Sequence, residues 1–199
     1  MCGRFYIEQD DPTEELLAII AEIERNLKDH PDGLLLKKGE IFPTDIVPAI
    51  IGSKTNQIQP IAMKWGFSKF DTKGVIINAR SETALEKPMF QKPMLTRRCL
   101  IPASNYFEWQ NVNEKKIKHA IYDPKSKLLY MAGCYRLEQN SPLPQFVILT
   151  KDAAPGIRYI HDRMPVILGS EAQHAWLGDN ANITAILQSA MEDMIAQAV

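Results

Sequence analysis

The spacing of hydrophobic residues follows a helical period near the start of the chain and changes to short strand-like runs further along. Residues 11–27 read DPTEELLAIIAEIERNL and repeat apolar residues every three or four positions, which predicts an amphipathic helix with one buried face. Asp11 is positioned to cap this helix, Pro12 suits its first helical position, and Glu14 completes a capping box. The predicted apolar face comprises Leu16, Leu17, Ile20, Ile23 and Leu27.

From residue 46 to residue 150 the pattern changes to short apolar or β-rich runs separated by turn residues, which predicts about eight strands. A stretch around Glu82 to Phe90 interrupts these runs and is compatible with a short helix. The predicted strands are DIVPAII, QIQPIAMKW, GVIINA, RCLIPA, YFEWQ, KIKHAIYD, KLLYMAGCY and QFVILT.

The C-terminal segment returns to a helical period, first in SEAQHAWL and then in a run that begins at Asn182. The apolar positions of that second run are Ile183, Ile186, Leu187, Met191, Met194 and Ile195. Many short strands with few long helical crossovers favour an α+β fold, in which helices flank a mainly antiparallel, barrel-like or sandwiched sheet, over a doubly wound one. We expect a single domain over residues 1–199, because this length buries one sizeable core.

Net charge, cysteine spacing and the length of the apolar runs limit the kinds of partner and site that the protein can have. A formal net charge of -1 gives no overall attraction to polyanions, so a nucleic-acid site requires a local concentration of Arg and Lys. Cys2, Cys99 and Cys134 are widely spaced without a C-x-x-C pair, which argues against a disulfide framework and against a metal site. Because the chain has neither a membrane-length apolar run nor a signal-peptide pattern, we expect a cytoplasmic monomer without cofactor, metal or membrane partner.

Several polar residues occupy positions that often carry function. Asn78 and Arg80 follow an apolar run where a strand ends, although turn stabilisation and a surface ion pair are the simpler interpretations. Glu108 lies between Phe107 and Trp109, and in a strand its side chain points opposite to both. Desolvation there raises a carboxyl pKa toward the range of a general acid, whereas an exposed glutamate on an edge strand is the alternative.

The segment IHDRMP places His161, Asp162 and Arg163 together before a proline. Histidine transfers protons near neutral pH, and arginine binds phosphate or carboxylate groups. The alternative interpretation is an ordinary His-Asp turn.

Cys2 follows the initiator methionine, and removal of Met1 places an amine and a thiol on adjacent carbons. With pKa values of about 8 and about 8.5, both groups are partly nucleophilic near neutral pH. An amine and an aldehyde form an imine, and the neighbouring thiol closes onto the imine carbon as a five-membered thiazolidine. An N-terminal cysteine also attacks amides or esters with its own amine as the base. Cys2 alone leaves both chemistries open.

Five motifs in order resemble the SOS response-associated peptidase family, the SRAP domain. They are MCGRF, WGF at Trp65 to Phe67, INARSET at Ile77 to Thr83, YFEW at Tyr106 to Trp109, and HDRMPVIL at His161 to Leu168. The resemblance extends from residue 2 to about residue 178. It implies a mixed α+β fold and a sensor of abasic sites in single-stranded DNA, which crosslinks to them through its N-terminal cysteine as a thiazolidine in the DNA damage response.

The resemblance also implies roles for individual residues. Cys2 is the crosslinking nucleophile, and Asn78 holds Cys2 and the sugar in place. Glu108 moves protons during sugar ring opening and imine formation. His161 bonds the oxygen of the opened sugar and assists formation or reversal of the crosslink. The abasic strand is the implied partner, and binding to it associates the protein with the nucleoid.

Arginines and aromatic residues complete the implied DNA contacts. Arg4, Arg80 and Arg163 match family arginines that contact phosphates flanking the lesion, a geometry that suits bidentate arginine. Glu40 departs from the family pattern, because it stands where the family often has an asparagine, while Pro43 is retained. The candidates for base contact or stacking are Trp65, Phe67, Phe70 and Trp109.

Three functions therefore remain open at the level of sequence. The first is abasic-site crosslinking, in which DNA stays attached. The second is a cysteine peptidase or N-terminal nucleophile hydrolase, which shares Cys2, Glu108 and His161 but turns its peptide over. The third is a non-catalytic DNA-binding module, for which Cys2→Ala leaves DNA retention intact.

Overall fold

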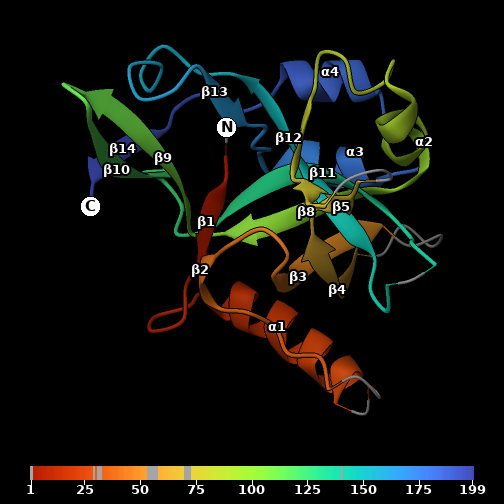
Figure 1. The fold of residues 1–199 in the computed structure, drawn as a ribbon. Helices are drawn as coiled ribbons and strands as arrows, with labels where there is room; N and C mark the ends of the chain where they lie inside the picture. The colour runs from red at the N-terminus through yellow and green to blue at the C-terminus, as the bar shows by residue number, and fades with distance from the viewer. Residues whose placement is uncertain (1, 29, 31–32, 53–57, 70–72, 140) are drawn as a thin grey trace.

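The computed structural model describes residues 2–28, 30, 33–52, 58–69, 73–139 and 141–199. Fourteen strands and four helices lie within these ranges (Figure 1). In chain order they are β1 (Arg4–Ile7), α1 (Glu14–Leu27), β2 (Gly39–Ile41), β3 (Ile46–Gly52), β4 (Ile58–Trp65), β5 (Phe67–Ser68), β6 (Val75–Ile76), β7 (Asn78–Arg80), α2 (Pro88–Thr96), β8 (Arg98–Ala103), β9 (Asn105–Val112), β10 (Lys115–Tyr122), β11 (Leu129–Arg136), β12 (Gln145–Asp152), β13 (Arg163–Pro165), α3 (Ser170–Leu177), α4 (Ile183–Gln188) and β14 (Ile195–Ala198).

Five strands close into a barrel. β11, β8, β3, β4 and β12 pair in that order, and β12 pairs again with β11. The neighbours in this ring run antiparallel except β4 and β12, which are parallel. The strands β7 and β13 lengthen the sheet along β12. This arrangement confirms the predicted α+β fold with a mainly antiparallel, barrel-like core.

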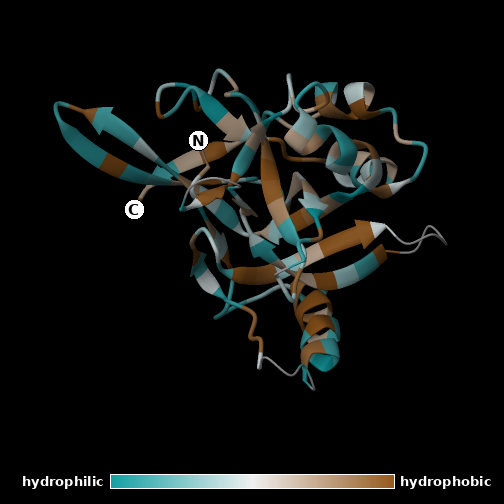
Figure 2. Ribbon diagram, turned by 45° about the vertical axis from the view of Figure 1, so that its right-hand side comes forward, coloured by the Kyte–Doolittle hydropathy of each residue, from teal (hydrophilic) through white to brown (hydrophobic). Residues whose placement is uncertain are grey.

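A second sheet, in the order β14-β10-β9-β1-β2, is antiparallel throughout. The hairpin of β9 and β10 extends away from the barrel (Figure 1) and is mostly hydrophilic, in contrast to the hydrophobic barrel strands (Figure 2). One cluster of buried apolar side chains joins residues from both sheets. β1 lies between the edge strand β2 and β9, so the strand that follows Cys2 is hydrogen-bonded on both sides.

The first helix forms as predicted but begins differently. Thr13 is its N-cap, and the Thr13 hydroxyl accepts a hydrogen bond from the Leu16 N–H at 3.2 Å, so the prediction of Asp11 as the cap was wrong. The buried face includes Ile19, whereas Leu17 is 50% exposed and lies off that face. The helix packs on β3 and β4.

Two further predictions need correction. The run from Asn182 does not continue as a helix to Ile195, because α4 ends at Gln188 and Ile195 begins a strand. β14 hydrogen-bonds to β10, which would otherwise be the sheet edge, and this pairing overrides the helical period of the sequence. In the stretch from Glu82 to Phe90, turns occupy residues 81–86 and α2 starts only at Pro88.

We predict that Thr13→Ala lowers the free energy of unfolding by about 1 kcal/mol, because it removes the acceptor for a helix N–H. Urea unfolding followed by circular dichroism measures this change. Asp11→Ala serves as the control, since Asp11 makes only an exposed ion pair with Lys127 and we expect little effect from its loss. Equal destabilisation by the two variants would contradict the assignment of Thr13 as the cap.

Candidate functional site

The Cys2 backbone is anchored by a residue far away in the sequence. The Asn78 Nδ2 donates a hydrogen bond to the Cys2 carbonyl oxygen at 2.8 Å. The pairing of β7 with the parallel strand β12, in which Asn78 lies opposite Ile148, fixes the position of Asn78. The buried Asn78 Oδ1 has no hydrogen-bond partner within the described residues, so it is an available acceptor beside Cys2.

The Cys2 thiol is fully buried. Burial raises the pKa of this thiol far above its ordinary value, and the negative charge of Glu108 raises it further. The Cys2 Sγ lies 3.8 Å from the Arg4 carbonyl oxygen, to which it donates a weak hydrogen bond. The thiol is therefore held in its neutral form.

Glu108 lies on β9 with only 3% of its surface exposed. Burial raises its pKa above the ordinary value of 4.5, and the positive charge of His161 works in the opposite direction. The desolvation expected for Glu108 is borne out by this burial. The alternative of an exposed edge-strand glutamate is wrong, because β9 pairs with β1 on one side and β10 on the other.

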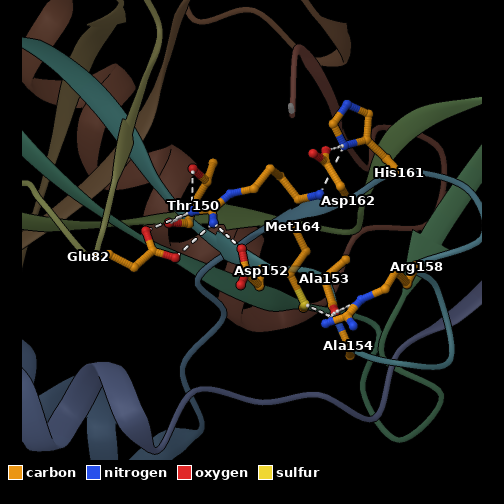
Figure 3. A network of polar contacts seen from close by, with 10 residues as sticks. Glu82, Thr150, Asp152, Ala153, Ala154, Arg158, His161, Asp162 and Met164 are labelled. Carbon is orange, nitrogen blue, oxygen red and sulfur yellow. Dashed lines mark hydrogen bonds and ion pairs between the residues drawn. The ribbon is translucent and has the colours of Figure 1, made fainter.

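The ring of His161 is held by its own neighbours in the chain (Figure 3). Its Nδ1 lies 2.9 Å from the Arg163 backbone nitrogen and 2.7 Å from the Asp162 Oδ1. A neutral Nδ1 accepts the N–H of Arg163, and a protonated Nδ1 pairs with Asp162. The ring is thus held in one orientation in either protonation state.

Arg163 differs from the expectation of a free phosphate ligand. Its guanidinium group is bound by the carboxylates of Glu82 and Asp152 and by the Thr150 carbonyl oxygen, as Figure 3 shows. These contacts join β13 and β12 to the turn that follows β7, and they leave Arg163 only 8% exposed. Arg163 therefore supports the His161 segment in this structure and presents no open guanidinium surface.

The other two arginines differ in exposure. Arg80 is exposed at the end of β7. Arg4 lies on β1 with 39% of its side chain exposed and makes an ion pair with Glu40. Of the three predicted phosphate ligands, Arg80 is thus the most open.

Two predicted base-contact residues belong to the core. Trp65 and Phe67 are both fully buried, so neither ring presents a face to a base in this arrangement. The Trp65 Nε1 donates to the Ile77 carbonyl oxygen at 3.1 Å. Gly66 between them has a φ of 109° and a Cβ there would lie 2.8 Å from Val75, which explains the glycine. Phe70 lies outside the described residues.

Sequence reasoning missed Tyr106. It shares the face of β9 with Glu108, two positions away, and it is fully buried. Its hydroxyl has no hydrogen-bond partner among the residues described. Burial raises the pKa of Tyr106 well above its ordinary value. The period-two spacing from Glu108 was the signal that could have identified it.

The described part of the chain contains no cluster of three His, Cys, Asp or Glu side chains suited to a metal ion. None of its helices combines the length and the apolar character needed to cross a bilayer.

Comparison with known proteins supports the family resemblance. The family model described as SOS response associated peptidase (SRAP) matches residues 1–199. The Abasic site processing protein YoqW of Bacillus subtilis is 34% identical over 203 residues, which cover 96% of this chain and 87% of that protein. The Abasic site processing protein YedK of Escherichia coli is 31% identical over 181 residues, covering 89% and 79% respectively.

A solved structure shows the same fold. The crystal structure of a protein from Bacteroides thetaiotaomicron has a TM-score of 0.79 with this chain at 24% identity, and covers 100% of this chain and 92% of its own. The match of the family model over the whole chain and the identity with curated relatives lead to one conclusion: this chain belongs to the SOS response associated peptidase family.

Proposed function

We propose that this protein recognises abasic sites in single-stranded DNA and forms a covalent thiazolidine crosslink with them through Cys2, shielding the lesion. Its relatives carry the name abasic site processing protein. The observation that carries the proposal is the hydrogen bond from Asn78 to the Cys2 carbonyl, which holds the aminothiol residue beside the buried Glu108.

The chemistry begins when loss of Met1 frees the Cys2 amine. The amine attacks the aldehyde of the ring-opened abasic sugar, and loss of one water gives an imine. The Cys2 sulfur then bonds to the imine carbon while its proton passes to the nitrogen, which closes the thiazolidine. The net reaction joins protein and DNA with release of one water.

The neighbouring residues supply the protons and the positioning. Glu108, with its raised pKa, gives a proton to the departing oxygen during ring opening and imine formation. His161 hydrogen-bonds the hydroxyl that the opened sugar releases, since its ring is already oriented by Asp162 and Arg163. Asn78 accepts a hydrogen bond through its available Oδ1.

The state of the thiol supports crosslinking over peptide hydrolysis. A cysteine peptidase attacks with a thiolate, and burial here opposes formation of the Cys2 thiolate. In the crosslinking reaction the amine makes the first bond, and the thiol has to lose its proton only when its sulfur closes onto the imine carbon. Peptidase activity beyond removal of Met1 is the second candidate function, because the same residues would serve it.

The strand is held by its phosphates. Arg80 on β7, the strand of Asn78, and Arg4 on β1, the strand that follows Cys2, supply the positive charge. Arg163 would join them only by exchanging its contacts with Glu82 and Asp152. We expect one monomer to act on one lesion, in the cytoplasm and at the nucleoid when bound to DNA.

The first test is the intact mass of the protein after mixing with a single-stranded oligonucleotide that contains one abasic site. We expect a protein without Met1 and an adduct heavier by the oligonucleotide mass less one water. Cys2→Ala, the matched control, should give no adduct. A processed protein that forms no adduct, or an adduct retained by Cys2→Ala, would overturn the proposal. Turnover of peptide substrates would then favour the peptidase.

The second test concerns Glu108→Gln, which keeps the shape of the side chain but removes the proton donor. With saturating abasic DNA in a quenched time course, we expect the rate constant of adduct formation to fall about 100-fold or more. Affinity for a strand with a tetrahydrofuran analogue, which lacks the aldehyde, should change less than about twofold because no phosphate ligand is removed. An unchanged rate constant would exclude the proton-transfer role.

The same variant has a pH-dependent effect on stability that serves as its control. A carboxyl with a raised pKa binds more protons in the folded state, so wild-type stability falls as pH rises from 4.5 through the folded pKa. Glu108→Gln has no carboxyl at this position and so does not lose stability in this way as the pH rises. Its free energy of unfolding, relative to wild type, should therefore increase with pH over this window, as measured by urea titration at several pH values.

The third test concerns Arg80→Gln. We expect weaker binding of the tetrahydrofuran strand and a salt dependence, d log K/d log[salt], that is smaller in magnitude by about 0.7, the value for one phosphate contact on a single strand. Fluorescence anisotropy across a salt series measures both. Arg25→Gln removes an equal charge from the exposed face of α1 and should leave the slope unchanged. Equal slopes for the two variants would remove Arg80 from the DNA surface.

A further inference from the structure

A carboxylate is held between two cations on the second sheet. Glu40 on β2 accepts a hydrogen bond from the Arg4 Nη1 at 3.1 Å and from the Lys118 Nζ at 2.9 Å, both on its Oε1. The three residues come from β2, β1 and β10. We call them the Glu40 cluster.

Aromatic rings lie beneath both cations. The Arg4 guanidinium carbon is 4.2 Å from the centroid of Phe42 and 5.3 Å from that of Trp109. The Lys118 Nζ is 3.9 Å from the centroid of Phe107 and 5.9 Å from that of Trp109. The strand register explains the arrangement, because Arg4 pairs with Phe107 and Lys118 pairs with Trp109. These contacts orient both cations before any ligand arrives.

The cluster adjoins the reactive residue. Arg4 is two residues from Cys2, and its carbonyl oxygen receives the hydrogen bond of the Cys2 thiol. Trp109 directly follows Glu108 and faces the opposite side of β9. The link between the cluster and the proposed nucleophile is therefore Arg4 on β1, two residues from Cys2.

The charge balance of the cluster suits displacement by an anion. The side chains of Arg4, Lys118 and Glu40 are 39%, 26% and 30% exposed, so the ion pairs are partly solvated and contribute little to stability. Burial tends to raise the pKa of Glu40, but the hydrogen bonds from Lys118 and Arg4 outweigh it and the pKa is lowered. Glu40 is thus ionised at neutral pH, and two cations share one negative charge.

We propose that Glu40 occupies the place of a DNA phosphate in the free protein, and that a phosphate of the bound strand displaces it to contact both Arg4 and Lys118. Lys118 is then a phosphate ligand that sequence reasoning did not identify, and Glu40 lowers the affinity for single-stranded DNA. This inference rests on the proposed function, in that it assumes a single strand as the ligand.

The test uses a single-stranded oligonucleotide with the tetrahydrofuran analogue and measures Kd by fluorescence anisotropy. Glu40→Gln should bind about three to ten times more tightly than wild type, because the phosphate no longer competes with a carboxylate. Glu24→Gln, on α1, is the matched control. It removes an equal charge from the exposed ion pair between Glu24 and Lys38, and should leave Kd unchanged within about twofold.

Lys118→Gln gives an independent measurement should Glu40→Gln fold poorly. We expect this variant to bind more weakly and to reduce the magnitude of the salt slope by about 0.7. If Glu40→Gln binds no more tightly than Glu24→Gln, Glu40 is only a structural anchor for Arg4 and the proposal fails. An unchanged salt slope for Lys118→Gln overturns the assignment of Lys118.

This experiment is separable from the test of crosslinking. The analogue has no aldehyde, so its binding does not depend on Cys2 chemistry. Tighter binding by Glu40→Gln in a protein that forms no adduct would leave this inference standing while the crosslinking proposal fails. If an adduct forms but neither Glu40→Gln nor Lys118→Gln changes the affinity, the crosslinking proposal stands and this inference fails.

Discussion

The arrangement of the site depends on one strand, β12, that is hydrogen-bonded along both of its edges. It pairs with β11 and then β13 along one edge, and with β4 and then β7 along the other. Residues 145–150 of this strand are all buried. Because β7 carries Asn78 and β13 begins two residues after His161, pairing with this one strand positions both residues, from its two edges. The second sheet contributes β1, which follows Cys2, and β9, which carries Glu108.

Local pattern was sufficient to identify most of the elements. The run RCLIPA coincides with β8, and the other predicted strands overlap observed ones, because a short apolar run between turn residues has few alternatives. Pattern failed where a long-range contact decided the outcome. The segment at Ile195 forms a strand because it pairs with the edge of β10. In the first helix the packing buries Ile19 and leaves Leu17 exposed.

The candidate site shows the same division. Residue types identified Cys2 and Glu108 as candidates, but the sequence left Glu108 either buried or exposed until β9 was found between β1 and β10. Sequence could not show that Arg163 is surrounded by Glu82 and Asp152, because the three residues meet only when β12 and β13 pair. Trp65 and Phe67 illustrate a different limit, since an aromatic residue near a site looks the same in sequence whether it faces solvent or the core.

The burial of Cys2 has a consequence for the survival of the protein in a cell under oxidative stress. Peroxides oxidise the thiolate form of cysteine to sulfenic acid, and the rate follows thiolate content and access. A thiol that is fully buried and kept protonated is a poor target for this reaction. Oxidative conditions damage DNA and thiols together, so under the proposed function the Cys2 thiol has to remain reduced until it meets an aldehyde. The buried position of Cys2 gives this protection without a second cysteine or a reducing partner.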